Sequence, residues 1–291
     1  MIELETLREK IEETGYITDP SLVSSLFLME QLQKPLLLEG DAGVGKTEIA
    51  KMLSQLYGCE LIRLQCYEGL DVHQAIYEWN YQRQLLAIKL YEGVNDDVTE
   101  REESIFSQRY LLQRPLLKAI SRLDSPVLLI DEIDRADEEF EAYLLELLSE
   151  FQITIPELGT ITATSIPRVI LTSNGTRELS DALRRRCLYH YVDYPSFEKE
   201  LRIVKSRLPE LGEILAKQMI HFVQNLRGSN LRKTPGIAET LDWAAALLRL
   251  KVDSLDEAIE IIPSTLGCLL KTEEDSRRIS TEQVESLLNK D

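Results

Sequence analysis

The chain has 291 residues with 33 basic and 50 acidic side chains, a formal net charge of −17, and 44% of its residues are hydrophobic. This composition is typical of folded globular proteins and excludes wholesale disorder, and the length suffices for about two domains. No apolar run approaches the ~20 residues of a membrane-spanning helix, and the first residues carry no signal-peptide pattern. We therefore expect a cytoplasmic protein without membrane insertion.

Charge and cysteine content limit the partners and metals that the chain is expected to hold. Residues 1–197 carry a net charge of −15 and residues 198–291 one of −2. Such a surface repels phosphate backbones, so nucleic acid is not expected as a partner. The cysteines form no CxxC pair and no zinc pattern, and they are expected to be small buried thiols in a reducing compartment: Cys59, Cys66, Cys187 and Cys268.

The predicted elements alternate between helices and short strands. The first 33 residues are expected to be helical, with Asp19 as the N-cap of a helix whose first residue is Pro20. Runs without strict polar alternation predict the strands of a parallel sheet that is covered on both faces. These strands are residues 35–38, 61–64, 127–130, 168–172 and 188–192.

Two segments interrupt this alternation. The polar stretch 93–103 is expected to be an exposed loop between helices, and residues 152–162 alternate around a turn and predict a β-hairpin. From about Glu198 the strand patterns stop and amphipathic helical patterns continue to the end of the chain. We therefore place a domain boundary at residues 194–196.

A phosphate-binding pattern, G-x-x-x-x-G-K-[ST], follows the first predicted strand and opens a helix. Its glycines let backbone N–H groups curl around a phosphate, the lysine neutralises phosphate oxygens, and the threonine hydroxyl holds Mg²⁺. A chain of this length meets the bare pattern by chance about one time in a hundred. The nucleotide-binding residues are expected to be Gly40, Asp41, Ala42, Gly43, Val44, Gly45, Lys46, Thr47 and Glu48.

A second acidic motif ends the third predicted strand. Asp131 and Glu132 follow four apolar residues, the form of a Walker B motif, and ligands bind at the carboxyl ends of such strands. We expect Asp131 to support the Mg²⁺ shell together with Thr47, and Glu132 to polarise the attacking water. Asp134 and Asp137 are expected to cap or solvate the following helix.

Two further polar groups follow later strands. Asn174 comes directly after the fourth strand and is a candidate to orient the water, although asparagine at a strand end is usually a turn former. The run Arg184-Arg185-Arg186 precedes the fifth strand, and such a run is usually a solvated face or a helix C-terminus.

With these elements in this order, the chain resembles the AAA+ ATPases, and within them the MoxR family. The resemblance is closest to the carbon monoxide dehydrogenase maturation (CoxD-like) branch and extends from about Gly15 to Ala245. It implies an α/β P-loop core with a parallel five-stranded sheet sandwiched by helices in residues 1–195, followed by a smaller all-α lid in residues 196–291. The strings that carry it are LLEGDAGVGKTEIAK (37–51), LQCYEGL (64–70), YEWNYQ (77–82), LIDEIDRADE (129–138) and LSDALRRRCL (179–188).

The resemblance also implies roles for single residues. Asn174 matches sensor 1, and Arg186 matches the arginine finger, with Arg185 as the alternative. Residues 67–82 match an insert in helix 2, and the hairpin at about 152–164 matches one that, like the insert, projects toward a central pore or a client. Tyr16 and Ile17 fall where the family packs the adenine, although aliphatic core packing accounts for them equally well.

The lid departs from the family pattern at one position. Gly236 stands where the family carries its sensor 2 arginine. Arg232 or Lys233, in the preceding turn, are the candidates to replace it, and solvated surface charge is an equally good interpretation of both. Lid contact with the γ-phosphate is otherwise expected to be weaker.

The function implied by the resemblance is ATP hydrolysis with Mg²⁺ by a ring, expected to be a hexamer. The ring acts as a chaperone-like remodeller that matures a metalloenzyme, such as a molybdenum-containing carbon monoxide dehydrogenase, with a von Willebrand factor A domain protein as partner. The alternatives are a nucleotide-dependent binding switch, a related assembly factor of the gas-vesicle type, and a DNA-directed AAA+ protein. The negative charge and the absence of a visible DNA-binding module disfavour the last.

Overall fold

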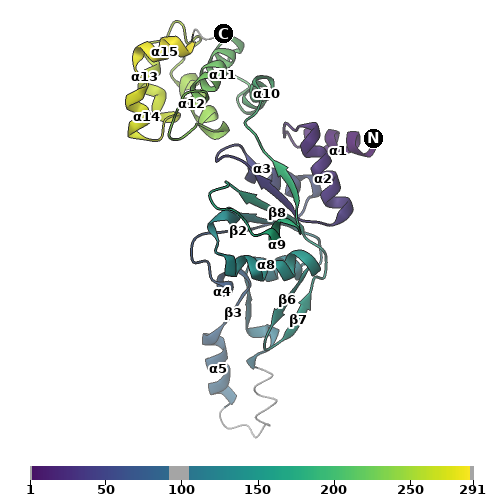
Figure 1. The fold of residues 1–291 in the computed structure, drawn as a ribbon. Helices are drawn as coiled ribbons and strands as arrows, with labels where there is room; N and C mark the ends of the chain where they lie inside the picture. The colour runs from purple at the N-terminus through teal and green to yellow at the C-terminus, as the bar shows by residue number, and fades with distance from the viewer. Residues whose placement is uncertain (1, 92–104, 289–291) are drawn as a thin grey trace. The chain divides into compact units, whose positions relative to one another are not determined.

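The computed structural model describes residues 2–91 and 105–288 (Figure 1). The chain divides into two compact units, which are described separately below. The first unit consists of Met1–Arg8, Pro20–Glu39 and Thr47–Tyr191, and the second of Glu9–Asp19, Gly40–Lys46 and Val192–Asp291. The domain ranges predicted from the sequence, 1–195 and 196–291, stay a prediction.

A five-stranded parallel sheet forms the centre of the first unit. Its strands lie in the order β2-β5-β8-β1-β9, so strands distant in sequence are neighbours and crossover connections are needed. All five predicted strands are confirmed, with small shifts at their ends. They are β1 (Leu36–Glu39), β2 (Leu61–Gln65), β5 (Val127–Asp131), β8 (Arg168–Ser173) and β9 (Leu188–Tyr191).

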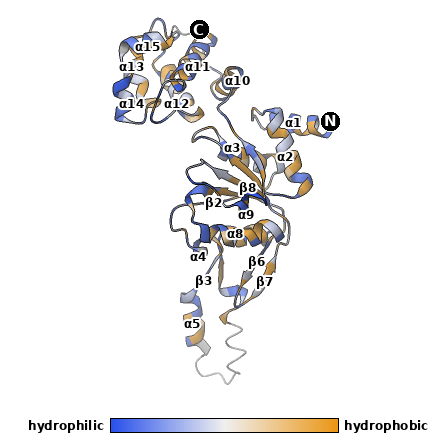
Figure 2. Cartoon of the chain, in the orientation of Figure 1, coloured by the Kyte–Doolittle hydropathy of each residue, from blue (hydrophilic) through white to orange (hydrophobic). Residues whose placement is uncertain are grey.

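Helices flank this sheet. Every residue of β5 is buried, as expected for a strand covered on both faces. Figure 2 shows helices that mix hydrophobic and hydrophilic residues, which is typical of elements with one face on a core. The described helices of this part of the chain include α1 (Ile2–Glu13) and α3 (Lys46–Tyr57), of which Glu9–Glu13 and Lys46 belong to the second unit. Further helices are α2 (Pro20–Leu32), α7 (Pro115–Ile120), η2 (Ile133–Arg135), α8 (Glu138–Glu150) and α9 (Asp181–Arg184).

Two small antiparallel sheets extend the first unit. The predicted hairpin is confirmed as β6 (Gln152–Ile155) paired with β7 (Gly159–Thr162). The predicted insert holds α4 (Val72–Ala75) and β3 (Tyr77–Trp79), and β3 pairs with β4 (Leu111–Gln113), a pairing the sequence did not predict. Between these strands lie α5 (Tyr81–Tyr91) and η1 (Gln108–Tyr110), whereas the predicted loop 93–103 falls outside the described residues.

The C-terminal part of the second unit is helical, as predicted. Trp243 and Phe222 are fully buried at its centre and their rings lie 5.1 Å apart, centroid to centroid. No helix in the described part of the chain is long and apolar enough to cross a membrane. The elements are α10 (Phe197–Arg207), α11 (Glu213–Arg227), α12 (Ile237–Arg249), α13 (Ile262–Thr265), η3 (Leu266–Cys268), α14 (Glu273–Arg278) and α15 (Thr281–Leu288).

Candidate functional site

The predicted phosphate-binding loop follows β1 in the sequence and ends where α3 begins at Lys46. Gly43 and Gly45 have φ angles of 84° and 97°, a left-handed conformation that glycine adopts without steric cost. The Lys46 side chain is buried, and its Nζ donates to the carbonyl oxygens of Gly40 and Asp41, both at 2.7 Å. The loop therefore curls around the buried Lys46 ammonium group, which two of its carbonyl oxygens hold in place.

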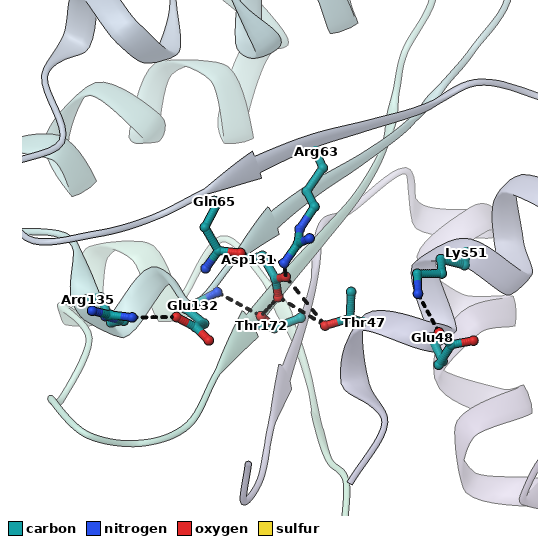
Figure 3. Close-up of polar contacts among 9 residues, drawn as sticks. All are labelled: Thr47, Glu48, Lys51, Arg63, Gln65, Asp131, Glu132, Arg135 and Thr172. Atoms are coloured by element: carbon teal, nitrogen blue, oxygen red, sulfur yellow. Dashed lines mark hydrogen bonds and ion pairs between the residues drawn. The ribbon is translucent and has the colours of Figure 1, made fainter. Parts of the chain in front are cut away.

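A polar cluster in the first unit surrounds the last residue of β5 (Figure 3). The Asp131 carboxylate is buried, and its Oδ1 accepts a hydrogen bond from the Thr172 hydroxyl at 2.5 Å. The Thr47 hydroxyl lies 3.3 Å from Oδ1 and 3.4 Å from Oδ2. Arg63, on the neighbouring strand β2, donates to Oδ2 at 2.5 Å. The sequence predicted the pairing of Thr47 with Asp131, but it gave no signal for Arg63 or Thr172.

Glu132 follows Asp131 in an uncommon backbone conformation. Its φ of 56° is left-handed, which few residues other than glycine adopt, and its N–H donates to the Thr172 hydroxyl at 2.9 Å. The Glu132 carboxylate is one-third exposed and accepts from Arg135 at 3.1 Å. Thr172 thus contacts both acidic residues, which fixes the turn that carries Glu132 out of the sheet.

The environment of Asp134 differs from the one predicted from the sequence. The prediction that it caps or solvates the following helix is wrong, because Asp134 is buried and its Oδ2 accepts from the N–H and hydroxyl of Thr176, at 3.0 and 2.6 Å. Asp137 does cap α8, by accepting from the N–H of Phe140 at 2.8 Å. The Asp134 contact links the turn after β5 to the loop after β8, which carries the half-buried Asn174.

The run of three arginines crosses the C-terminal end of the short helix α9: Arg184 is its last residue, Arg185 is its C-cap and Arg186 follows the helix. Arg184 pairs with Glu39 at 3.6 Å. Arg186 is half-buried and donates to the Ser149 hydroxyl and to the carbonyl oxygen of Ala182. Arg185 is exposed, and within the described residues neither it nor Arg186 forms an ion pair with a carboxylate.

In the second unit, the residues predicted near the nucleotide are dispersed over several turns. Tyr16 and Ile17 are half-buried in the connection between α1 and α2. The backbone N–H groups of Arg232 and Lys233 donate to the two carboxylate oxygens of Asp275, at 2.8 and 3.1 Å, and the Arg232 side chain lies 3.6 Å from Glu274. These bonds, with that of the Thr272 hydroxyl, hold the pKa of Asp275 below its usual range.

Gly236, where the resemblance to the MoxR family led us to expect a sensor 2 arginine, packs against the predicted phosphate-binding loop. The N–H of Ile237 donates to the carbonyl oxygen of Gly43 at 3.0 Å. A Cβ atom on Gly236 would lie 2.7 Å from the Gly43 Cα and carbonyl oxygen, so no side chain fits there without displacement. The close approach of the two backbones therefore gives a steric reason for glycine at position 236.

The donor atoms at the end of β5 fit a magnesium–nucleotide complex. Mg²⁺ binds through one or two oxygen ligands from the protein with phosphate oxygens, and the Thr47 hydroxyl and Asp131 carboxylate are such ligands side by side. Within the described residues, no group of three or more His, Cys, Asp or Glu side chains could hold a metal ion by itself. The Thr47 and Asp131 oxygens would thus serve a cation that shares its remaining ligands with phosphates.

The cysteines meet the prediction only in part. Cys66 is fully buried next to this site, where burial raises the pKa of its thiol to about 12. Burial also raises the pKa of Cys187 to about 12, although this residue, like Cys59 and Cys268, retains some exposed surface. Thiols with such raised pKa values are poor nucleophiles and metal ligands.

One known protein family matches the chain over the residues that form this site. A family model described as "AAA domain (dynein-related subfamily)" matches residues 35–187, more than half of the chain, from the start of β1 through the polar cluster to the arginine run. The chain belongs to this AAA family. Membership implies nucleotide binding, usually with Mg²⁺.

Two relatives of this AAA protein come from staphylococci and are both described as uncharacterized proteins. The chain is 27% identical over 240 residues to an uncharacterized protein of Staphylococcus aureus (strain USA300), which covers 80% of this chain and 82% of that protein. An uncharacterized protein of Staphylococcus epidermidis is 28% identical over 247 residues, covering 83% and 84%. Among solved structures, a mutant of RuvB from Thermotoga maritima has a TM-score of 0.49 and 18% identity, and the match covers 92% of this chain and 71% of that one.

Proposed function

We propose that this AAA protein binds ATP with Mg²⁺ and hydrolyses it. The observation that carries the proposal is the cluster in which the Thr47 hydroxyl and the buried Asp131 carboxylate lie together, directly after the lysine that the phosphate-binding loop surrounds. AAA membership supports the proposal, because the matched residues include all three side chains.

The roles of the residues follow from their chemistry. When bound, ATP would supply the phosphoanhydride bond that is broken, and Mg²⁺ would neutralise part of the negative charge on the phosphates. Lys46 and the loop N–H groups bind phosphate oxygens, Thr47 and Asp131 hold the cation, and the Glu132 carboxylate takes up the proton of the attacking water. Asn174 orients that water. The chain thus contributes positioning and charge stabilisation.

A ring is the assembly that we propose for this ATPase, since an arginine finger must come from a neighbouring subunit to reach a γ-phosphate. Arg186, with Arg185 as the alternative, is the proposed finger, and six subunits are expected.

The resemblance of residues 64–82 and 179–188 to the MoxR family supports a remodelling role in metalloenzyme maturation with a von Willebrand factor A partner. Exposed Tyr81, Leu85 and Leu86 on α5 are available for such contacts.

The test separates binding from hydrolysis. Glu132→Gln should bind a fluorescent ATP analogue with Mg²⁺ as the unmodified protein does, but hydrolyse ATP about 10²–10⁴-fold more slowly, because an amide cannot accept the proton. Lys46→Ala should lose nucleotide affinity while its far-UV circular dichroism is retained. Glu139→Gln, the same change on the exposed side of α8, is the matched control.

The outcomes distinguish the candidate functions. Hydrolysis by Glu132→Gln at the unmodified rate would remove Glu132 from catalysis. Binding without turnover by the unmodified protein would favour a nucleotide-dependent switch, and salt-dependent DNA binding would favour a DNA-directed protein. Affinity purification with the Glu132→Gln protein and ATP would then identify the client and test the metalloenzyme assignment.

A further inference from the structure

Arg63 contacts the site from a strand that carries none of the predicted functional residues. It lies in β2, where it and Gln65 project on the same face, and its guanidinium donates to Gln65 and to Asp131 Oδ2 (Figure 3). The Arg63 side chain is 51% exposed, whereas that of Asp131 is 4% exposed. A solvent-accessible cation thus pairs with a buried carboxylate at the proposed metal site.

Asp131 accepts hydrogen bonds from two neutral groups and from one charged group. Its two neutral donors are the hydroxyls of Thr172 and Thr47, whereas Arg63 is its one ion-pair partner among the described residues. A buried carboxylate without a counter-charge is costly, so the structure needs a cation at this place. Arg63 supplies that positive charge beside the oxygen atoms that we assign to Mg²⁺.

We propose that Arg63 is a positioning residue that substitutes for Mg²⁺ at Asp131 and yields the carboxylate when Mg²⁺ arrives with nucleotide; this rests on the proposed function. A guanidinium and a divalent cation beside one carboxylate repel each other, so Arg63 and Mg²⁺ compete for Asp131. Because half of the Arg63 side chain is exposed, it can rotate into water, while the two threonine hydroxyls stay in place. Mg²⁺ then binds well only with the negative phosphates that offset this competition.

The competition predicts a change in the Mg²⁺ requirement. In a titration of Mg²⁺ at fixed fluorescent ADP, Arg63→Gln, which keeps a hydrogen-bond donor but not the charge, should reach half-saturation at about tenfold lower Mg²⁺, a typical strength for a charge-assisted bond. Arg63→Lys should stay within about threefold of the unmodified protein. Arg114→Gln, which removes an exposed arginine paired with Glu78, is the matched control and should change nothing.

A second measurement separates this role from simple stabilisation. In EDTA, Arg63→Gln should lower the melting temperature, and added Mg²⁺ with ADP should close that gap, because Mg²⁺ then neutralises Asp131. In an Asp131→Asn background, the Arg63→Gln change should leave the Mg²⁺ midpoint unaltered, since the carboxylate for which both cations compete is gone.

The outcomes that overturn the proposal are distinct from failure of the proposed function. An Arg63→Gln protein with an unchanged or higher Mg²⁺ midpoint, and the same loss of melting temperature with and without Mg²⁺, would make Arg63 a structural residue only. An unmodified protein that binds no nucleotide at saturating Mg²⁺ would overturn the proposed function itself and the role of Arg63 with it.

Discussion

Two buried carboxylates paired with arginine, one from each unit, differ in how far the arginine is exposed to solvent. In the second unit, Glu200 is fully buried and its two oxygens accept from Arg227, which is only 8% exposed, at 2.7 Å each. In the first unit, Asp131 is almost as buried, but Arg63 reaches it through one bond from a half-exposed side chain. A closed pair serves the fold, whereas an open pair can exchange its cation for a ligand.

The surroundings of Arg227 explain its closure. Its Nε donates to the carbonyl oxygen of Pro235 at 2.9 Å, and its guanidinium lies 4.9 Å from the ring centroid of Tyr194. Thr240 donates to Glu200 at 2.9 Å from α12. The pair therefore joins α10, α11 and α12 and fixes the turn that precedes Gly236. Because Glu200 is fully buried, no cation from solvent can replace Arg227 at its carboxylate.

The largest expected effect concerns an arginine that is held by neutral groups only. Arg186 bonds to a hydroxyl and a carbonyl oxygen, so no carboxylate among the described residues neutralises its charge, as the proposed finger role requires. Arg186→Ala should leave nucleotide affinity nearly intact and lower the hydrolysis rate by about 10³–10⁵, or about 4–7 kcal/mol of transition-state stabilisation. Steady-state ATPase assays measure this, with Arg185→Ala in parallel expected to have the weaker effect.

Subunit mixing provides the control for this prediction. Lys46→Ala subunits keep Arg186 but bind no ATP, and Arg186→Ala subunits bind ATP but lack the arginine. Mixed assemblies should regain part of the activity. No recovery in confirmed mixed assemblies would mean that Arg186 acts within its own chain or only ends α9.

The closed pair should give the next largest effect. Arg227→Met leaves the Glu200 carboxylate buried without a counter-charge, so the free energy of unfolding should fall by about 3–5 kcal/mol in urea denaturation. Arg63→Gln should change it by less than about 1 kcal/mol at saturating Mg²⁺ and nucleotide, as for exposed pairs. Adding Glu200→Met to Arg227→Met should restore most of the loss; if it restores none, packing rather than charge holds the three helices.

The smallest effect concerns Asp275, whose carboxylate is held by backbone N–H groups instead of an arginine. Because its folded-state pKa is lowered, its contribution to stability is complete above the unfolded pKa, about 3.9, and is lost as the pH falls through the folded-state value. Asp275→Asn should therefore flatten the acid side of the stability profile. Urea midpoints between pH 7 and pH 3 measure this, and the exposed Asp253→Asn should retain the full acid dependence.

Local patterns predicted the parts of this molecule that depend on neighbouring residues in sequence. The five strands, the hairpin, the start of α2 at Pro20 and the cap of α8 by Asp137 all follow from short-range periodicity and capping chemistry. The phosphate-binding loop was equally visible, because its function requires glycines and a lysine at fixed spacing.

The contacts that complete the site join distant residues and left no local signal. Arg63 is an ordinary polar residue of a half-exposed strand in the sequence, and only the β2–β5 register places it at Asp131. Asp134 resembles a helix cap by position, but Thr176 lies beside it because β8 neighbours β5. Both contacts depend on which strands are neighbours in the sheet, and the spacing of residues along the sequence does not specify that order.

A junction made only of backbone atoms has no side chain that substitution can trim or enlarge. Where Gly236 meets Gly43, hydrophobic or charged replacements are equally excluded by the 2.7 Å separation of a Cβ from the opposite backbone. Any substitution of Gly236 would therefore disrupt this contact, and a smaller side chain would not preserve part of it. An arginine introduced at position 236 would therefore first push the predicted phosphate-binding loop and α12 apart, before its charge could contact any ligand.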